Sequence, residues 1–426
     1  MKNRMKALLA ATAATAIMTS FAGVARADDA ADAPAAPPAT WASAIKYYGH
    51  LDVGASLNPD SPSDNLNFGQ VFTDKSNQVL LNSLSLTAER DPDTSAKTID
   101  VGFKLQVAYG SDSRFTQAIG EFNRDISSIN QFDVVEANVT AHLPYLTAGG
   151  VELKVGQYGT LEGVEVMDPT GNFFYSKSYL FNFGIPLKHV GIMTETHLSP
   201  LVDLYLGIDS GVNTSLGSQG GANDSSIHFH GGVGLNFKDV TILATTHIGP
   251  EDYNYNYPGK PTAVSGNRYL NDAVVTWKVN DKLTSTTDIN YIYDEPYKAG
   301  GGGVTEYLAY TLTPTTTLGA RAEVWEDNKN FYVAEYPGYF DFINFEGGYA
   351  PSTVYGLTPG KSTTYSEITL GINYKPAGLP KMIDGLTFRP EVRYDATLNG
   401  GANPYDVGTK NHQVTIGLDM VVPLTF

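Results

Sequence analysis

The residues that could bind a metal ion in this sequence are few. His228 and His230 are two positions apart, so on a β-strand their side chains would share one face and could together contact an ion. The sequence shows no third ligand for them, and a polar wall is the favoured interpretation. The acidic segments 60–64 and 91–93 lack the spacing of a calcium-binding loop. We therefore expect no metal site.

The sequence also lacks the patterns of an enzyme active site. A barrel enzyme would need a serine or carboxylate nucleophile beside an oriented base, and no such arrangement is found. The glycine run at 300–303 does not follow a strand and open a helix, as a phosphate-binding loop would, and it is expected to be a flexible tip. Neither catalytic residues nor a cofactor are expected.

The first 27 residues predict an export signal. Lys2, Arg4 and Lys6 precede an apolar run, and Ala25-Arg26-Ala27 places small residues where signal peptidase cleaves. The run is shorter than the ~20 residues of a spanning helix, which favours cleavage over a retained anchor. The mature chain would begin at Asp28 and contain 399 residues.

The composition favours an exported β-protein. The hydrophobic fraction is 42% and the mean hydropathy is −0.18, while tyrosine (26), phenylalanine (19) and glycine (43) are abundant. Cysteine is absent, so burial and hydrogen bonding must supply the stability. Removal of the signal lowers the formal net charge from −17 to −21, which argues against a nucleic-acid partner. The acidity fits solvated loops as well as it fits cation selectivity.

Residues 28–43 are expected to form a flexible periplasmic segment, because they offer little to bury. From residue 44 to residue 426, segments of about ten residues alternate apolar with polar side chains, as strands of a sheet do. Counts of 14 or 18 strands remain open, and sixteen is preferred. The sixteen segments lie near 45–56, 79–89, 98–109, 131–142, 150–157, 189–197, 202–211, 227–237, 239–248, 270–279, 283–293, 304–313, 316–326, 363–374, 386–395 and 412–426.

The connections between these segments distinguish a membrane barrel from a soluble sandwich, which would alternate in the same way. Long links rich in Gly, Asn, Asp or Pro alternate with links that are mostly tight turns. This is the pattern of outer-membrane barrels, in which an even strand number places both termini in the periplasm. A spanning sheet must also close on itself, since each backbone N–H and C=O needs a partner. We therefore expect one all-β domain, a transmembrane antiparallel barrel from 44 to 426.

A barrel of 16 strands is wide enough to leave an aqueous lumen. The parity set by apolar neighbours places a group of charged side chains on its inward face. They suit a wetted wall, and they could equally form pairs that stiffen the barrel. These wall candidates are Lys104, Glu152, Lys154, Asp288, Arg321, Glu323, Arg389, Glu391 and Arg393.

The third long connection, residues 158–188, is too rich in aromatic residues to be a solvated linker. Such a segment either folds into the lumen or caps the mouth of the barrel, because burial of its apolar surface is favourable. Inward folding is preferred, and it would narrow the pore. The candidate constriction charges are Glu162, Glu165, Asp168 and Lys177.

The same region carries a family resemblance. The blocks 153–168 and 173–186, followed by His189 and Gly191, resemble the OmpL-like β-barrel porins of Gram-negative outer membranes. Further similarity covers 101–105, 389–395 and the last strand, whose terminal Phe426 resembles the signal that barrel-assembly machinery recognises. Lys177 stands where the family has Arg, and Lys188 also departs from the pattern. The resemblance implies a porin without a defined substrate.

These observations together predict an outer-membrane porin, a passive aqueous channel for small hydrophilic solutes or ions. The alternative is a plugged barrel that binds or adheres through its outer loops, and an enzyme is the least favoured class. The expected partners are outer-membrane lipid and lipopolysaccharide, and the assembly machinery through Phe426. The sequence leaves open whether the chain forms a homo-oligomer.

Overall fold

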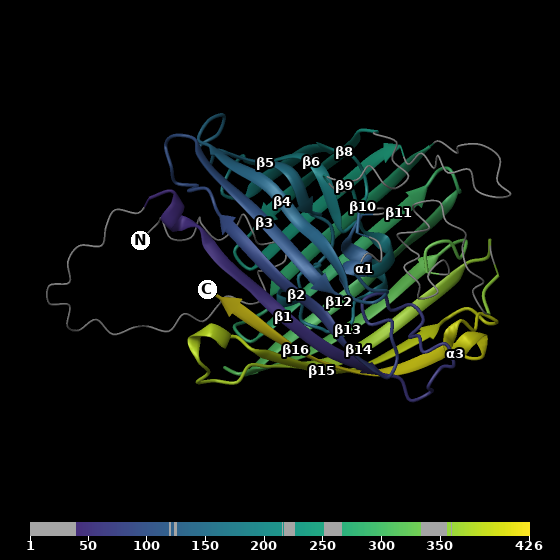
Figure 1. Cartoon of the computed structure of the whole chain (residues 1–426). Helices are drawn as coiled ribbons and strands as arrows, with labels where there is room; N and C mark the ends of the chain where they lie inside the picture. The colour runs from purple at the N-terminus through teal and green to yellow at the C-terminus, as the bar shows by residue number, and fades with distance from the viewer. Residues whose placement is uncertain are drawn as a thin grey trace.

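Sixteen antiparallel strands close into a barrel in the computed structural model, which describes residues 40–118, 121–122, 126–214, 216, 226–250, 266–333, 356–358 and 360–426 (Figure 1). The first eight strands are β1 (Lys46–Leu57), β2 (Gln78–Arg90), β3 (Asp100–Gly110), β4 (Gln131–Leu143), β5 (Val151–Gly159), β6 (Lys188–His197), β7 (Val202–Asp209) and β8 (His228–Asn236). The others are β9 (Val240–Pro250), β10 (Asn267–Lys278), β11 (Leu283–Asp294), β12 (Ala299–Thr313), β13 (Thr316–Asp327), β14 (Thr363–Tyr374), β15 (Thr387–Thr397) and β16 (His412–Thr425).

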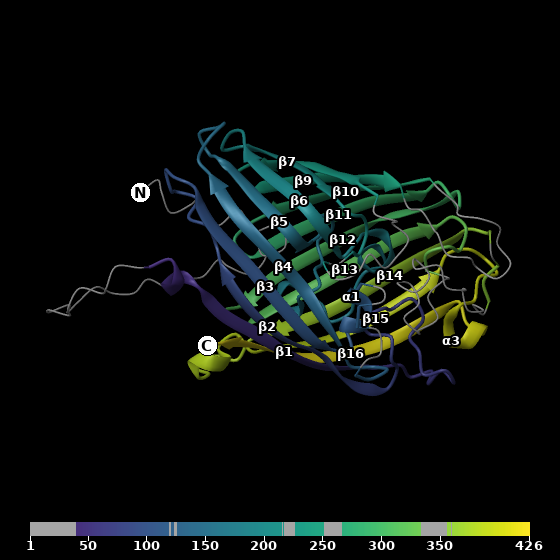
Figure 2. The ribbon, with the colours of Figure 1, turned by 45° about the horizontal axis from the view of Figure 1, so that its top comes forward.

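Each strand pairs with its neighbours in the chain, and β1 closes the barrel against β16 with Val53 opposite Met420. The prediction of a closed antiparallel barrel with sixteen strands is therefore confirmed. Closure matters physically because an open edge would leave backbone groups without partners in a bilayer. The strands are tilted against the barrel axis in both ribbon views (Figures 1 and 2).

The strand ends that the long connections join lie at one end of the barrel, which we call the loop end, and those joined by short links lie at the other, the turn end. The chain termini meet at the turn end, where the N–H of Phe426 donates to the carbonyl of Tyr47 at 3.2 Å. Two short helices lie in the long connections, α1 (Ser113–Thr116) and α3 (Tyr405–Gly408). In both ribbon views α1 lies within the ring of strands (Figures 1 and 2).

The glycine run at 300–303 is not the flexible tip that the sequence suggested. These residues are part of β12, where Gly301 pairs with Ile292 of β11 and with Asp327 of β13. A Cβ on Gly301 would lie 2.6 Å from the ring of Trp325. The absence of side chains here makes room for a large aromatic on the neighbouring strand, which is why a turn-like composition occurs inside a strand.

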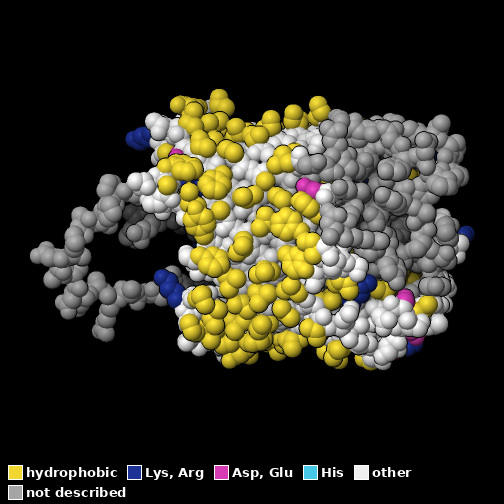
Figure 3. Space-filling view, in the orientation of Figure 1, with side chains coloured by type: hydrophobic (Ala, Val, Ile, Leu, Met, Phe, Trp, Pro, Cys, Tyr) yellow, Lys and Arg dark blue, Asp and Glu magenta, His cyan; other side chains and the backbone are white. Residues whose placement is uncertain are grey.

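The two faces of the sheet differ in polarity. On β14, Ile368 and Leu370 are 55% and 60% exposed on the outside, while Glu367 and Thr369 point inward and are at most 1% exposed. Apolar side chains cover the outer face of the strands in the view of Figure 3, with few charges among them. Such an apolar exterior suits contact with lipid. No helix in the described residues is long and apolar enough to cross a membrane.

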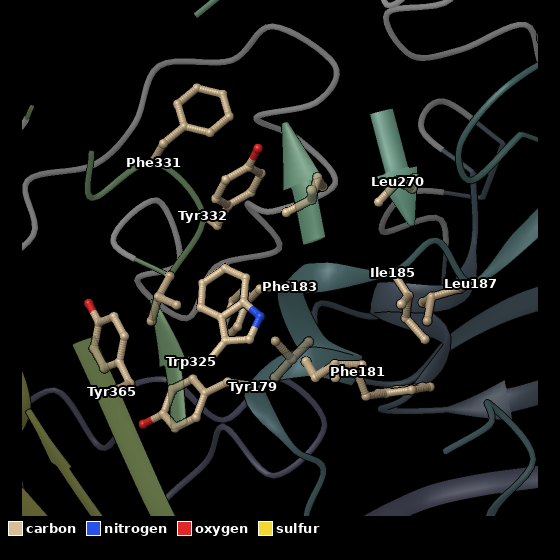
Figure 4. Close-up of a cluster of buried hydrophobic side chains, with 14 of the residues drawn as sticks. Tyr179, Phe181, Phe183, Ile185, Leu187, Leu270, Trp325, Phe331, Tyr332 and Tyr365 are labelled. Carbon is tan, nitrogen blue, oxygen red and sulfur yellow. The ribbon is translucent and has the colours of Figure 1, made fainter. Parts of the chain in front are cut away.

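The largest apolar cluster of buried side chains lies inside the barrel. Tyr179, Phe181 and Phe183 from the third long connection pack against wall residues such as Trp325 and Tyr365 (Figure 4). The rings of Tyr179 and Tyr365 are stacked with centroids 5.1 Å apart. Other members come from other long connections, among them Phe72, Phe115 and Tyr332. The interior is thus filled from the loop end by segments that the barrel encloses.

Candidate functional site

The third long connection, residues 160–187 and called loop 3 below, is bound to the inner wall through its backbone. The carboxylate of Glu391 on β15 accepts the N–H groups of Tyr175 and Ser176 at 2.9 and 3.0 Å. Glu323 on β13 accepts those of Tyr179 and Leu180 at 2.6 and 2.7 Å. Buried N–H groups without partners would be costly, so these carboxylates make it favourable for an irregular segment to lie inside the barrel.

Three wall arginines bind the carbonyl groups of loop 3. Arg321 donates to the carbonyl oxygen of Ser176 at 2.7 Å. Arg389 donates to the carbonyls of Pro169 and Asn172, both at 2.8 Å. Arg393 donates to the carbonyl of Lys177. The inward charges that the sequence placed on β13 and β15 are therefore contacts of loop 3.

Strands β10 and β11 hold the two ends of loop 3. Asp272 accepts the N–H of Gly163 at 3.0 Å, and Asp288 accepts that of Val164 at 2.9 Å. Asn290 donates to the carbonyl of Gly184 at 2.9 Å. Of these three residues, only Asp288 is among the wall residues predicted from the sequence, although Asp272 and Asn290 have the same inward parity on their strands.

Glycines on the inner wall leave room for the aromatic residues of loop 3. A Cβ on Gly319 would lie 2.0 Å from the ring of Phe173, and one on Gly54 would lie 2.7 Å from the ring of Tyr175. Because any larger side chain would occupy the same space, the wall and the loop are complementary in shape.

The four constriction candidates lie in different surroundings. Glu165 is buried and forms an ion pair with Arg321 at 2.8 Å. Lys177 is buried, donates to the carbonyl of Val166 at 3.2 Å, and lies over the ring of Phe181. Glu162 is buried against His230, 3.9 Å from its ring. Asp168 is the most accessible, with 29% of its side chain exposed. They do not form one cluster.

Asp168 faces a polar hollow between loop 3 and strands β1 to β4. The hollow is small, with about 20 Å³ open to the centres of water molecules. Its polar lining is His50, Ser83, Ser85, Gln106, Asp112, Ser113, Thr116 and Asp168. Loop 3 is thus bound closely to β13 and β15, while polar space remains on its opposite side.

The charges at this hollow are set by burial and by neighbouring groups. Burial by itself raises the pKa of Asp168, but His50 and the hydrogen bonds from Thr170 outweigh it and hold that pKa below its usual value. Burial raises the pKa of Asp112 to about 7, against the opposing effect of Lys177. Burial also lowers the pKa of Lys177 to about 8. Asp168 therefore stays anionic, whereas the other two titrate near neutral pH.

Comparison with known proteins agrees with this architecture. The model of the family described as "Putative beta-barrel porin-2, OmpL-like" matches residues 44–424. The chain belongs to this porin family. Membership of a family of outer-membrane porins is consistent with the closed sixteen-stranded barrel. The protein is an outer-membrane porin channel. No curated protein matches the sequence significantly.

Solved structures share the fold of this porin at low identity. The outer-membrane channel DcaP of Acinetobacter baumannii superposes with a TM-score of 0.51 at 12% identity, covering 89% of this chain and 97% of that one. An anion-selective porin from Comamonas acidovorans gives 0.54 at 9%, with coverages of 90% and 99%. Pseudomonas putida OprB gives 0.51 at 15%, with coverages of 89% and 94%. OmpT of Vibrio cholerae, solved in a trimer form, gives 0.50 at 11%, with coverages of 89% and 98%.

The remaining wall candidates of the porin lie towards the turn end and contact other residues of the wall. Lys104 contacts Glu136 at 2.7 Å, and Glu152 contacts His142. Lys154 lies over the ring of Tyr158 at 5.9 Å. Each is partly exposed, unlike the arginines of β13 and β15. This part of the wall is accessible to water and does not bind loop 3.

A serine, a histidine and a carboxylate meet in the polar hollow, which the sequence analysis did not foresee. Ser83 lies 2.9 Å from Nε2 of His50, and Asp168 lies 3.3 Å from Nδ1 of the same ring. Ser85 also contacts that Nδ1, at 2.8 Å. The three come from β1, β2 and loop 3, so no local spacing in the sequence could have revealed the arrangement.

The sequence alone shows no third ligand for His228 and His230. The structure brings His189, Asp209 and His247 from neighbouring strands to the same inner surface. It also places Gln70 of the first long connection inside the barrel, where it donates to Asp395 at 3.0 Å. These contacts form only when the sheet closes into a barrel, so they could not be predicted from individual residues in the sequence.

Proposed function

We propose that this porin conducts small hydrophilic solutes and ions passively through the gap between loop 3 and strands β1 to β4, and that loop 3 narrows the pore. The proposal rests on the difference between the two sides of loop 3. Its backbone is hydrogen-bonded to Glu323, Glu391 and three arginines on one side. On the other side it faces the polar hollow, where Asp168 is partly exposed.

We further propose that the gap favours cations. Asp168 and Asp112 line it, and Asp168 retains its charge because its pKa is held low. A fixed negative charge at the narrowest part of a pore raises the local concentration of cations. The wall arginines do not oppose this effect fully, since Arg321, Arg389 and Arg393 are each paired with carboxylates.

The test is the single-channel conductance and reversal potential of the refolded protein in a planar bilayer under a salt gradient. We expect stable conductance steps with a cation-selective reversal potential. Asp168→Asn should shift that potential towards anions. The matched control is Asp281→Asn, because the Asp281 side chain is 99% exposed in a turn outside the barrel. Equal shifts in both variants would contradict a role for Asp168.

Shortening loop 3 tests the constriction itself. Deletion of residues 166–180 removes the segment that lies between Arg389 and the hollow. We expect a larger single-channel conductance, because the narrowed part of the lumen widens. An unchanged conductance in a folded barrel would refute the proposal that loop 3 limits passage.

A plugged barrel acting through its outer loops is the second candidate, and one observation favours it. Arg321, Arg393 and Glu367 are at most 1% exposed although they lie on the inner wall, so the lumen is filled on that side. The two candidate functions predict different conductance of the unmodified protein. A folded barrel that shows no conductance steps would favour the plugged form.

We propose that the Ser83–His50–Asp168 arrangement has no catalytic role and fixes the position of Asp168. Both ring nitrogens of His50 already contact a serine, which holds the imidazole in place. A serine-directed fluorophosphonate probe should therefore leave Ser83 unlabelled, as judged by mass spectrometry. Labelling that is lost in Ser83→Ala would instead indicate a nucleophile.

The export and assembly predictions are proposed as well. The signal at 1–27 lies outside the described residues, as does most of the segment 28–43, and the mass of the mature protein would test cleavage before Asp28. We propose assembly in the outer membrane through the strand that ends in Phe426, with lipid and lipopolysaccharide around the apolar exterior. The trimer form of OmpT supports a homo-oligomer, which cross-linking in membranes would test.

A further inference from the structure

The inner surface beside β6 to β9 carries a cluster of metal-ligating side chains that conduction does not use. It contains His189 of β6, Asp209 of β7, His230 of β8, His247 of β9 and Glu162 of loop 3, each at most 4% exposed. One ligand atom each from Glu162, His189 and His230 lies within 4.8 Å of the other two. The group therefore joins loop 3 to the wall of the barrel.

His230 is oriented between two carboxylates. Its Nε2 lies 3.9 Å from Oε1 of Glu162, and its Nδ1 lies 3.7 Å from Oδ2 of Asp209. An Nδ1–H directed at Asp209 would leave the lone pair of Nε2 facing Glu162. Metal-binding histidines are commonly held in this way, with a carboxylate on the ring nitrogen that does not bind the ion.

His189 has the same orientation. Its Nδ1 lies 3.1 Å from the carbonyl of Gly211 and 3.5 Å from Oδ2 of Asp209. A carbonyl only accepts, so the contact with Gly211 places a proton on Nδ1. The Nε2 atom lies 3.1 Å from Oγ1 of Thr160, whose single proton is donated to Oε2 of Glu162, so this Nε2 donates to Thr160 and must release that proton before it can bind an ion. Both Nε2 atoms thus face the side of Glu162.

Several of these atoms have no hydrogen-bond partner among the described residues. They are Oε1 of Glu162, Oδ2 of Asp209 and both ring nitrogens of His230. Buried polar atoms left in this state are costly, and two buried carboxylates in one place need positive charge beside them. A divalent cation between Glu162, His189 and His230 would satisfy the free atoms and balance the charge.

We propose that Glu162, His189 and His230 bind a divalent transition-metal ion such as Zn²⁺, with Asp209 orienting both histidines. Two imidazoles and one carboxylate are a common donor set for zinc, whereas Ca²⁺ and Mg²⁺ take oxygen ligands. Ligand atoms around a tetrahedral zinc ion are about 3.3 Å apart, given bonds of about 2.0–2.1 Å. The 3.9 Å between Glu162 and His230 closes to that separation with a small side-chain movement.

A second group of potential ligands on the same wall lacks these properties. In the Glu195–His197–Asp203 group, His197 already contacts Asp203 at 2.6 Å and Tyr205 donates to Glu195 at 2.9 Å. The His197 side chain is 21% exposed, so water reaches it. This group is internally satisfied and provides a matched control.

Zinc titration of the metal-free, refolded mature protein by calorimetry tests the site independently of conduction. We expect one Zn²⁺ per barrel, no measurable binding at this site in His230→Gln or His189→Gln, and about 10–100-fold weaker binding in Asp209→Asn. His197→Gln should bind as the unmodified protein does. Binding that survives both histidine variants, or that is lost in His197→Gln, would refute the assignment.

A spectroscopic measurement on the unmodified protein covers the case in which a variant does not fold. Co²⁺ in a four-coordinate site absorbs visible light far more strongly than six-coordinate Co²⁺. We expect the strong absorption at one equivalent of Co²⁺ and its loss when Zn²⁺ is added. A weak spectrum, or no zinc uptake by the unmodified protein, would overturn the proposal and leave protonated histidines as the charges that balance Asp209 and Glu162.

Discussion

Arg321 of β13 donates a hydrogen bond over 2.8 Å to Glu165 of loop 3, although 156 positions separate them in the chain. The same guanidinium also contacts Glu367 of β14 and the carbonyl of Ser176. All of these side chains are at most 4% exposed. One cation therefore joins two strands of the wall to the segment that crosses the lumen.

Removing this cation should release loop 3. In Arg321→Met, Glu165 would lose its ion pair with Arg321 and Glu367 would keep the longer contact with Arg393 at 3.8 Å, and breaking such a buried pair costs about 3–5 kcal/mol. We expect faster cleavage within loop 3 by added protease and a larger, noisier single-channel conductance. The barrel itself should remain, because its strand pairing does not involve Arg321 side-chain contacts.

Lys104→Met is the control for this variant. Lys104 pairs with Glu136 of β4 towards the turn end, where 25% of its side chain is exposed, and so binds a neighbouring strand and not loop 3. Its removal should leave protease sensitivity unchanged. If both variants behave alike, general loss of wall charge would explain the effect better than release of the loop.

The ion selectivity should depend on pH. As pH rises from 6 to 9, Asp112 loses its proton near pH 7 and becomes anionic, and Lys177 loses its proton near pH 8 and becomes neutral. Both changes make the gap more negative, so the preference for cations should increase. Reversal potentials at a series of pH values measure this.

Lys177→Met separates the two titrations. Without the lysine a single transition should remain, that of Asp112, and it should lie above pH 7 because Lys177 lowers the pKa of Asp112. Glu165 raises the pKa of Lys177, whereas Arg389 and Arg321 lower it. A selectivity that does not vary with pH would contradict the assignment.

The glycines of the inner wall should be intolerant of substitution for a specific reason. In Gly319→Leu, the Cβ alone would fall 2.0 Å from the ring of Phe173, so loop 3 would have to move. We expect altered conductance and a lower thermal midpoint, since overpacking costs about 1–3 kcal/mol. Gly378→Leu, at a position with nothing within 4 Å, controls for the added apolar side chain, although its φ of +77° adds backbone strain of its own.

Trp325 should contribute to stability far more than Trp277. Trp325 is 0% exposed in the cluster inside the barrel and donates to Asn290 at 3.2 Å, whereas Trp277 is 50% exposed on the outside. Trp325→Ala should cost about 3–5 kcal/mol. The temperature at which the folded band disappears in unheated gel electrophoresis measures the loss. A larger effect of Trp277→Ala would contradict the role of the inner cluster.

The barrel could be predicted from the sequence because its signal is local. The alternation from Val414 to Phe426 repeats at every strand, and the lengths of the connections follow directly along the chain. The strand with the glycine run was the exception: β12 begins at Ala299, five residues before the predicted segment. The glycines of β12 make room for the large side chain of Trp325 on the next strand, and this contact cannot be predicted from the sequence of β12 alone.

The site was harder to predict, because its contacts join residues that are far apart in the chain. Inward parity located Arg321 and Glu391, but it could not show that their partners are backbone atoms of loop 3. His189, Asp209 and His230 lie on three different strands, and only the hydrogen-bond register brings them together. Glu162 reaches them because loop 3 turns inward, which is a property of the closed barrel and not of any short motif.

The distances along the chain between loop 3 and its partners set an order of events during folding. Gly163 and Asp272 are 109 positions apart, and Asn172 and Arg389 are 217 apart. The loop belongs to the N-terminal half of the polypeptide, whereas most of the groups that bind it belong to the C-terminal half. Its aromatic residues must therefore stay unpaired until the later strands have joined the sheet. Docking of loop 3 would be a late step of biogenesis, completed after the membrane-embedded wall has formed.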